Sequence, residues 1–384
     1  MKAIQFKIRF AFLGLITMVV LAQGVVAKEA PPLLIAYFVP SDRVAIPGYV
    51  ERIDRLMQEV QRFYREGMAT NGYGPLTFSL DREEDGKLKI WKVQGKEPML
   101  TYGRNSSGAV RNEVKAGLLA KGVNPDARVL VIFQVLLDRQ GVKTTEIGSY
   151  VGAGDYYSGT AWFYDDEKLD PALLGSKGPG GYYASREVSL GEFNSHYIGG
   201  IAHELGHAFG LPHVAGAAGE RRHSLMGDGN HTYGQELRKE GAGSYLHPAS
   251  ALLLARCRAL TGDLPGGRTQ LKAAFNGLKA AYETNTLILD GVLASTPPAF
   301  AVIGYNDNKA IAGDYDATGW VAKVDAAGKF ELRIGDIRPG SFELRLQVVG
   351  VNGATRTFPI AYTVDGNGIP DTSAFKSGEE GGVK

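Results

Sequence analysis

Two histidines and a glutamate have the spacing of a metal site. His203 and His207 lie four positions apart, and Glu204 directly follows the first histidine. On a helix, residues four apart lie on one face, so the two imidazoles can reach the same point. Glu204 projects beside that point, where its carboxylate can hold a metal-bound water. The spacing therefore predicts a zinc site with a base next to it.

A third histidine follows where the helix must end. Gly210 can adopt the left-handed conformation that ends a helix, and Pro212 prevents the helix from resuming. The chain then turns, so His213 can approach the same point from a non-helical segment. Three neutral imidazoles leave one position of a tetrahedral Zn²⁺ open for chemistry. We therefore predict one catalytic zinc as the cofactor and Glu204 as the general base that activates a zinc-bound water.

This pattern resembles the metzincin clan of zinc endopeptidases, whose signature has the same spacing of histidines, glutamate and glycine, followed by a methionine turn. The resemblance implies that Met226 forms a hydrophobic floor beneath the ligands. It also makes Tyr233 a candidate for substrate binding, with plain packing of its ring as the alternative. Asp228 stands where astacins and serralysins carry a tyrosine ligand, so we expect no such ligand. The zinc helix is matrixin-like, and the subfamily stays open.

Three other histidines are weaker candidates as ligands. His223 and His231 also lie beyond the helix, but the helix-ending residues favour His213 as the third ligand. His196 lies seven residues before His203, too far along the helix axis to share the metal, and we interpret it as a capping or surface residue.

These observations predict a zinc-dependent endopeptidase that acts on proteins or peptides. Two rivals stay open: a different zinc amidase that acts on cell-wall peptides, and a non-catalytic binding protein stabilised by zinc. Glu204 argues against the second rival, because a structural zinc needs no base. The near-neutral net charge of +1 gives no reason to expect nucleic acid as a partner. The oligomeric state is not indicated by the sequence.

The first 27 residues have the pattern of a secretory signal peptide. A basic start is followed by the short apolar stretch 10–21 and by small residues that end at Ala27. We expect cleavage there and a secreted or periplasmic protein without a membrane span, with an uncleaved anchor as the alternative. The single cysteine, Cys257, cannot form an intramolecular disulfide, so the exported chain must be stabilised by its core and bound ions.

Hydrophobic periodicity predicts an α/β (α+β) catalytic domain over residues 28–264. Apolar runs and helical spacing alternate as strand, helix, strand, helix, strand, which favours a twisted, mostly parallel sheet. The expected elements are strands at 33–39, 88–93 and 128–137 and helices at 50–64 and 105–119. One stretch between 144 and 164 is expected to be an edge strand that pairs with an extended substrate, or else a core strand. The zinc helix should begin near Asn194 or Ser195, and a further helix should span 249–260.

A smaller all-β domain is predicted after this catalytic domain. We expect a linker at 265–285, an immunoglobulin- or fibronectin-like sandwich over 286–366 and a flexible tail over 367–384. No catalytic cluster is evident there, so the domain is expected to target, present substrate or stabilise. The segment 365–371 faintly resembles a calcium loop, and a polar turn is the favoured alternative.

Overall fold

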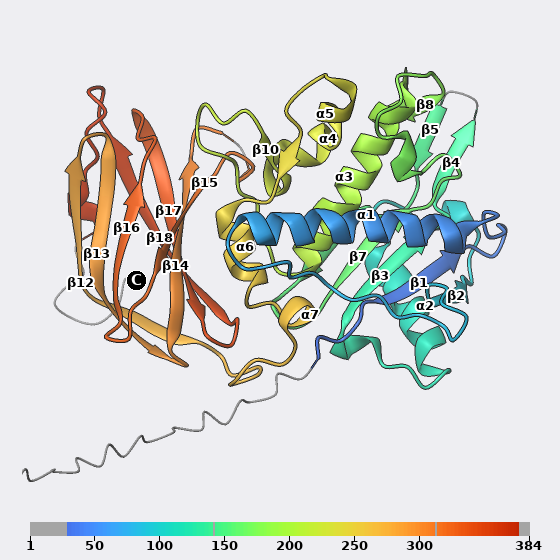
Figure 1. The fold of residues 1–384 in the computed structure, drawn as a ribbon, viewed down its shortest axis with the longest axis horizontal. Helices are drawn as coiled ribbons and strands as arrows, with labels where there is room; N and C mark the ends of the chain where they lie inside the picture. Colours follow the sequence, from blue (N-terminus) through green and yellow to red (C-terminus); the bar gives the residue numbers. More distant parts are fainter. Residues whose placement is uncertain (1–28, 141–142, 312, 376–384) are drawn as a thin grey trace, which may run out of the picture.

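The computed structural model describes residues 29–140, 143–311 and 313–375, which form two lobes (Figure 1). The predicted signal peptide, 1–27, lies outside the described residues. In the described part of the chain, no helix is long and apolar enough to cross a bilayer.

The N-terminal lobe is built on a five-stranded sheet in the order β2-β1-β3-β7-β6. Four strands are parallel, and the edge strand β6 pairs antiparallel with β7. The strands are β1 (Leu34–Val39), β2 (Ile90–Gln94), β3 (Val129–Gln134), β6 (Val151–Gly154) and β7 (Gly159–Tyr164). β1 and β3 are buried along their whole length, as expected for parallel strands covered on both faces. The predicted strands and the mostly parallel sheet are confirmed. Of the stretch 144–164, β6 forms an edge strand, and its antiparallel direction was not predicted.

Two predicted helices of this lobe are also confirmed, α1 (Tyr49–Thr70) and α2 (Ser107–Leu119). α1 crosses α3 (Leu190–Ala208), which is the predicted zinc helix (Figure 1), and the Tyr64 hydroxyl donates to the Ala202 carbonyl of α3 over 2.7 Å. The shorter elements complete the lobe: β4 (Leu137–Gln140), β5 (Lys143–Glu146), β8 (Gly181–Tyr183), β9 (Arg186–Val188), β10 (His223–Ser224), α4 (Asn230–Thr232), α5 (Gln235–Arg238) and β11 (Ser244–Tyr245).

The zinc helix α3 spans Leu190–Ala208 and begins earlier than predicted. Ser189 is the N-cap, and its hydroxyl accepts a hydrogen bond from the backbone N–H of Glu192 over 3.0 Å. Serine followed three residues later by glutamate is a capping-box sequence, which the prediction overlooked. Asn194 and Ser195 are fully buried inside the helix instead of capping it.

The single helix predicted at 249–260 is wrong. The chain forms two short helices, α6 (Pro248–Leu254) and α7 (Arg258–Thr261), which are separated by a turn. Cys257 is the buried N-cap residue of α7, and burial raises the pKa of its thiol to about 12. It is therefore an unreactive core thiol.

The C-terminal lobe consists of two antiparallel sheets, in the orders β12-β13-β16 and β15-β14-β17-β18, with one shared apolar core. Its strands are β12 (Lys272–Glu283), β13 (Thr286–Thr296), β14 (Ala299–Asn308), β15 (Thr318–Lys323), β16 (Lys329–Ile334), β17 (Gly340–Gly350) and β18 (Thr355–Val364). The linker prediction for 265–285 is wrong over β12, a full strand of the first sheet. The immunoglobulin- or fibronectin-like type stays a prediction.

The predicted tail and calcium loop also differ from the structure. Phe375 is buried, with its ring centroid 5.3 Å from that of Tyr362, so the chain is packed at this point. Asp365 uses one carboxylate oxygen to accept the N–H groups of Asn367 and Ile369, at 2.9 and 2.8 Å. This is the polar turn that was the alternative, and calcium is unsupported.

The two lobes share a packed interface next to the predicted third ligand. The backbone N–H of Ala215 donates to the Ala317 carbonyl over 2.8 Å, and Ala215 forms a parallel bridge with Thr318. Side chains of β14, including Ile303 and Tyr305, belong to the apolar core of the N-terminal lobe. The C-terminal lobe therefore contacts the segment that directly follows His213.

Candidate metal centre

The structure brings His203, His207 and His213 together. The Nε2 atom of His207 lies 3.1 Å from the Nε2 atoms of both His203 and His213. Nitrogen ligands at about 2.1 Å from a tetrahedral zinc are separated by about 3.4 Å, so the cluster fits this ion. One potential ligand atom from each of the three histidines lies within 4.8 Å of the other two, as a shared metal ion requires. No other group of three or more His, Cys, Asp or Glu side chains among the described residues meets this condition.

Each ligand is oriented through its other ring nitrogen. His203 Nδ1 lies 2.7 Å from the Leu225 carbonyl oxygen, and His207 Nδ1 lies 2.8 Å from the Leu211 carbonyl oxygen. A carbonyl can only accept, so both Nδ1 atoms carry the proton. The lone pairs of these two neutral imidazoles are therefore on Nε2, the atoms that converge.

The third ligand is oriented by a carboxylate from the other lobe. His213 Nδ1 donates to Asp314 Oδ1 over 2.7 Å, and Arg345 donates to the second oxygen, Oδ2, over 3.1 Å. Burial by itself would raise the pKa of Asp314, but the bonds from His213 and Arg345 hold it below its usual value. Asp314 is therefore an ionised acceptor for the His213 ring.

Burial keeps the ligands neutral. Desolvation lowers the pKa of His203 to about 3, and it also lowers the pKa of His207. Neutral imidazoles are the form that binds a metal, so the site needs no proton release from these two ligands near neutral pH.

Glu204 lies beside the histidine cluster and faces the edge strand of the sheet. Its Oε2 accepts the backbone N–H of Gly152 in β6 over 2.7 Å. Burial raises the pKa of Glu204 to about 7, although the hydrogen bond from Gly152 lowers it in part. A carboxylate poised near neutral pH is suited to exchange protons with a reacting group.

Met226 is fully buried beneath α3. Its Sδ is so close to the zinc helix that a Cβ on Gly206 would lie 2.5 Å from it. The Met226 carbonyl accepts the N–H of Val214, which directly follows the third ligand, over 3.1 Å. Met226 therefore packs against α3 and next to the segment of His213, and its role as a methionine turn stays a prediction.

Tyr233, the candidate for substrate binding, lies against α1. Its side chain is buried, and its hydroxyl donates to Glu59 Oε1 over 2.6 Å. Its ring is tilted against that of Phe63, with 5.5 Å between the centroids. These contacts favour the packing role that was the alternative.

The remaining histidines stay outside the metal cluster. His223 Nδ1 lies 2.8 Å from Asp228 Oδ2, while His196 and His231 pair with each other, 3.1 Å apart at their Nδ1 atoms. Burial, and then the neighbouring His231, lower the pKa of His196 to about 4. Its ring stacks on Tyr183 at 3.7 Å, so the capping or surface role predicted for His196 is wrong.

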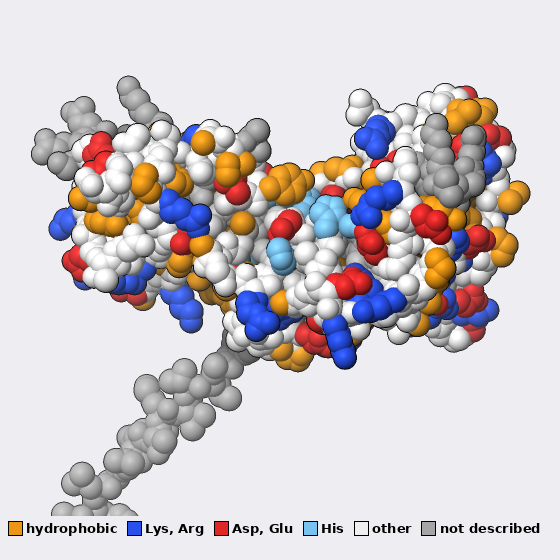
Figure 2. Space-filling model, turned by 90° about the horizontal axis from the view of Figure 1, so that it is seen from above, with side chains coloured by type: hydrophobic (Ala, Val, Ile, Leu, Met, Phe, Trp, Pro, Cys, Tyr) orange, Lys and Arg blue, Asp and Glu red, His pale blue; other side chains and the backbone are white. Residues whose placement is uncertain are grey.

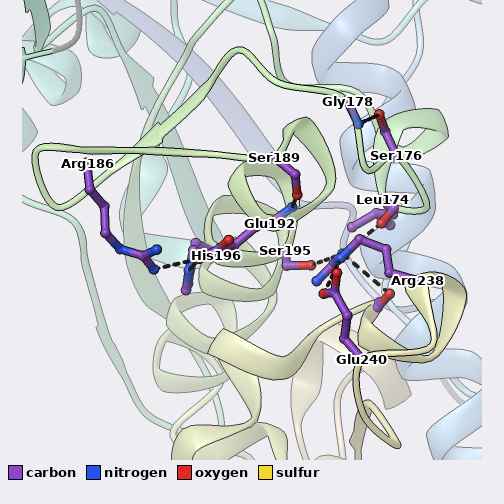
Figure 3. Close-up of polar contacts among 11 residues, drawn as sticks. Leu174, Ser176, Gly178, Arg186, Ser189, Glu192, Ser195, His196, Arg238 and Glu240 are labelled. Carbon is purple, nitrogen blue, oxygen red and sulfur yellow. Dashed lines mark hydrogen bonds and ion pairs between the residues drawn. The ribbon is translucent and has the colours of Figure 1, made fainter.

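The first half of α3 is held by hydrogen bonds from two arginines (Figure 3). Arg238 is buried and donates to the Ser195 hydroxyl and the Leu174 carbonyl, at 2.8 and 2.7 Å. Arg186 donates to Glu192, which lies beside His196 (Figure 3). These bonds fix the helix that carries two of the three candidate ligands.

Sequence reasoning missed Asp314, Arg345 and Tyr315. The Tyr315 ring stacks on His213 at 3.7 Å and is 56% exposed, so it covers the ligand from the C-terminal lobe. Asp314 is 101 residues from His213 in the chain, and no motif links the two. Histidine side chains are visible in the hollow between the lobes (Figure 2).

Comparisons with known proteins support the fold. No family model matches the chain, and a search of the curated proteins found no significant match. Among solved structures, the chain is similar to wild-type OgpA from Akkermansia muciniphila, with a TM-score of 0.73, 23% identity, and coverage of 89% of this chain and 96% of that chain. A catalytically inactive OgpA in complex with an O-glycopeptide substrate, glycodrosocin, gives the same values. The likeness extends over both lobes, so the two-lobed arrangement is shared with OgpA.

Proposed function

We propose that this protein is an exported, zinc-dependent peptidase of metzincin type that cleaves peptide bonds in O-glycosylated peptides. The observation that carries the proposal is the convergence of three imidazole Nε2 atoms beside the Glu204 carboxylate, at the free edge of a sheet. His203, His207 and His213 would hold the zinc. Export rests on the sequence of residues 1–27.

In this proposal, Glu204 and Gly152 have different roles in peptide hydrolysis. Zinc, when bound, polarises the scissile carbonyl and acidifies water. The Glu204 carboxylate accepts the proton of the attacking water and then donates it to the leaving amine. The Gly152 N–H keeps that carboxylate pointing toward the sheet edge, where a substrate strand would lie.

The edge strand β6 is the proposed platform for the substrate. It pairs with β7 on one side, and among the described residues no strand pairs with its other side. An extended peptide can add there as a further strand, with backbone hydrogen bonds supplying affinity. Such a peptide would pass directly over Glu204, so an internal bond would be presented to the base.

The glycosylated substrate class is proposed from OgpA. That protein shares the fold over both lobes and was crystallised with an O-glycopeptide substrate. The surface is hollowed between the lobes (Figure 2), which would give a side branch of the peptide a place to lie.

The test is to incubate the zinc-loaded mature chain with one peptide in two forms, O-glycosylated and bare, and to identify products by mass spectrometry. We expect a single cut peptide bond near the glycosylated residue, much faster in the glycosylated form. Equal rates would remove the glycan from the proposal. If the zinc-loaded protein cut neither peptide but hydrolysed a bond in cell-wall peptides, the amidase would become the better assignment. Binding of peptides without cleavage of any of them would favour a non-catalytic binding protein.

A further inference from the structure

The loop between β14 and β15 carries two side chains that enclose the third ligand. Asp314 contacts the ring edge of His213, with 2.7 Å between Oδ1 and Nδ1. Tyr315 covers a face of the same ring, with 3.7 Å between centroids. Of the three ligand histidines, His203 and His207 are oriented by carbonyls of their own lobe, whereas His213 depends on the other lobe.

Asp314 is itself held by the central strand β17. Arg345 donates to Asp314 Oδ2 over 3.1 Å, and its guanidinium lies over the ring of Tyr305 at 5.8 Å. Tyr305 belongs to the apolar core that the C-terminal lobe shares with the N-terminal lobe. A continuous set of contacts therefore runs from the interface of the lobes through Arg345 and Asp314 to His213.

We propose that Asp314 is a positioning residue for the metal centre, anchored by Arg345, and that zinc affinity depends on the C-terminal lobe through this pair. The proposal deepens the proposed function, since it assumes that the histidine cluster binds zinc. His213 reaches the cluster from a non-helical segment, so its ring has more freedom to turn than a ring on α3. The carboxylate fixes the Nδ1–H tautomer and points Nε2 at the metal.

The Asp314→Asn variant separates this role from bulk stability. It keeps the size of the side chain, but an NH₂ donor replaces one of the two carboxylate oxygens. The bonds from His213 to Oδ1 and from Arg345 to Oδ2 therefore cannot both be kept in this geometry. Loss of such an outer partner lowers metal affinity by about 10- to 100-fold. Arg345→Gln leaves the Asp314 bond to His213 in place and removes its anchor, so we expect a smaller loss. Glu331→Gln is the matched control, because Glu331 is exposed on β16 and bonds Arg333, away from the interface.

The experiment measures the zinc dissociation constant of each full-length mature variant by competition with a chromogenic chelator. Melting temperatures of the metal-free forms and the visible spectra of the cobalt-substituted forms are recorded alongside. We expect Asp314→Asn to bind zinc at least tenfold more weakly, with an altered cobalt spectrum and an unchanged metal-free melting temperature, while the control binds like the parent.

Parental zinc affinity in both Asp314→Asn and Arg345→Gln would overturn the proposal. If Asp314→Asn did not fold, Arg345→Gln alone would decide it, by losing zinc affinity or keeping it. These outcomes do not require cleavage: a parent that binds zinc but cuts no peptide refutes the proposed function, while the affinity difference still tests the positioning role.

Discussion

Replacing Gly152 by alanine should damage the centre although no ligand and no base is replaced. A Cβ at this position of β6 would overlap the carbonyl oxygen of Glu204, and it would lie 2.6 Å from the carbonyl carbon of Glu204 and 3.0 Å from Cβ of His207. Ordinary contact begins at 3.4 Å, so clearing the carbonyl carbon alone needs a separation of about 0.8 Å, and clearing the oxygen needs more. These obstacles lie on or next to the backbone of α3, which cannot rotate away as a flexible side chain could.

The separation has two consequences. The 2.7 Å hydrogen bond from Gly152 to Glu204 would lengthen beyond the limit of such bonds, so the carboxylate would lose its orientation. A misplacement of about 1 Å at a catalytic group can lower turnover by about 10²-fold. Overpacking of this kind typically lowers the free energy of unfolding by about 1–3 kcal/mol. We therefore expect both quantities to fall, with the loss of turnover corresponding to about 2.7 kcal/mol of activation free energy.

The assay compares Gly152→Ala with Gly108→Ala, in peptide cleavage, zinc content and chemical denaturation. Gly108 lies in α2, where an added Cβ meets nothing within 4 Å, so the control should cleave normally and be as stable as the parent or slightly more stable. Parental turnover in Gly152→Ala would refute the reasoning, because it would mean that the close approach of β6 to Glu204 does not position the base.

Three further predictions follow from the same contacts. Glu204→Gln should keep stoichiometric zinc and lower turnover by about 10²-fold or more, because an amide accepts no proton; near-normal turnover with bound zinc would place the base elsewhere. His213→Ala should lose zinc in a chelator competition, while His223→Ala, which removes a histidine paired with Asp228, should retain it; the opposite pattern would exclude the metzincin assignment. Tyr233→Phe removes the hydrogen bond to Glu59 and should lower the free energy of unfolding by about 1 kcal/mol with turnover unchanged; a loss of turnover at parental stability would return Tyr233 to the substrate site.

The convergence of the three histidines could be predicted from the sequence because it depends on residues only a few positions apart. Helical spacing determines that His203 and His207 share a face, and Gly210, with a φ of 84°, ends the helix as expected. The strands of the N-terminal sheet were predictable for a similar reason, since β1 and β3 are uninterrupted apolar runs.

The missed features depend on contacts between distant segments. The bond from His213 to Asp314 joins residues that are 101 positions apart, and nothing in the Asp314 segment distinguishes it from a surface turn. β12 was overlooked because its buried and exposed residues do not alternate strictly, owing to an irregularity in its pairing between Asn276 and Lys279. Helix starts were misjudged where two polar residues, Asn194 and Ser195, are buried by tertiary contacts instead of capping.

The packing of the lobes also changes the expectation for the C-terminal domain. Sequence reasoning found no catalytic cluster in it and assigned it a supporting role. Asp314 and Tyr315 of this domain contact the candidate ligand His213, so in our proposal the domain takes part in the metal centre. The division into a catalytic domain over 28–264 and a separate β domain stays a proposal. We do not expect the first domain to work normally without the second.

The central claim is that the three histidines and Glu204 form a zinc peptidase centre, and metal removal with reconstitution tests it most directly. The glycosylated peptide is incubated with the parent protein, with the chelated protein after loss of metal has been confirmed, and with that protein after one equivalent of Zn²⁺ is restored. We predict cleavage at one peptide bond in the first and third samples and none in the second. Undiminished cleavage by the metal-free protein would contradict the claim.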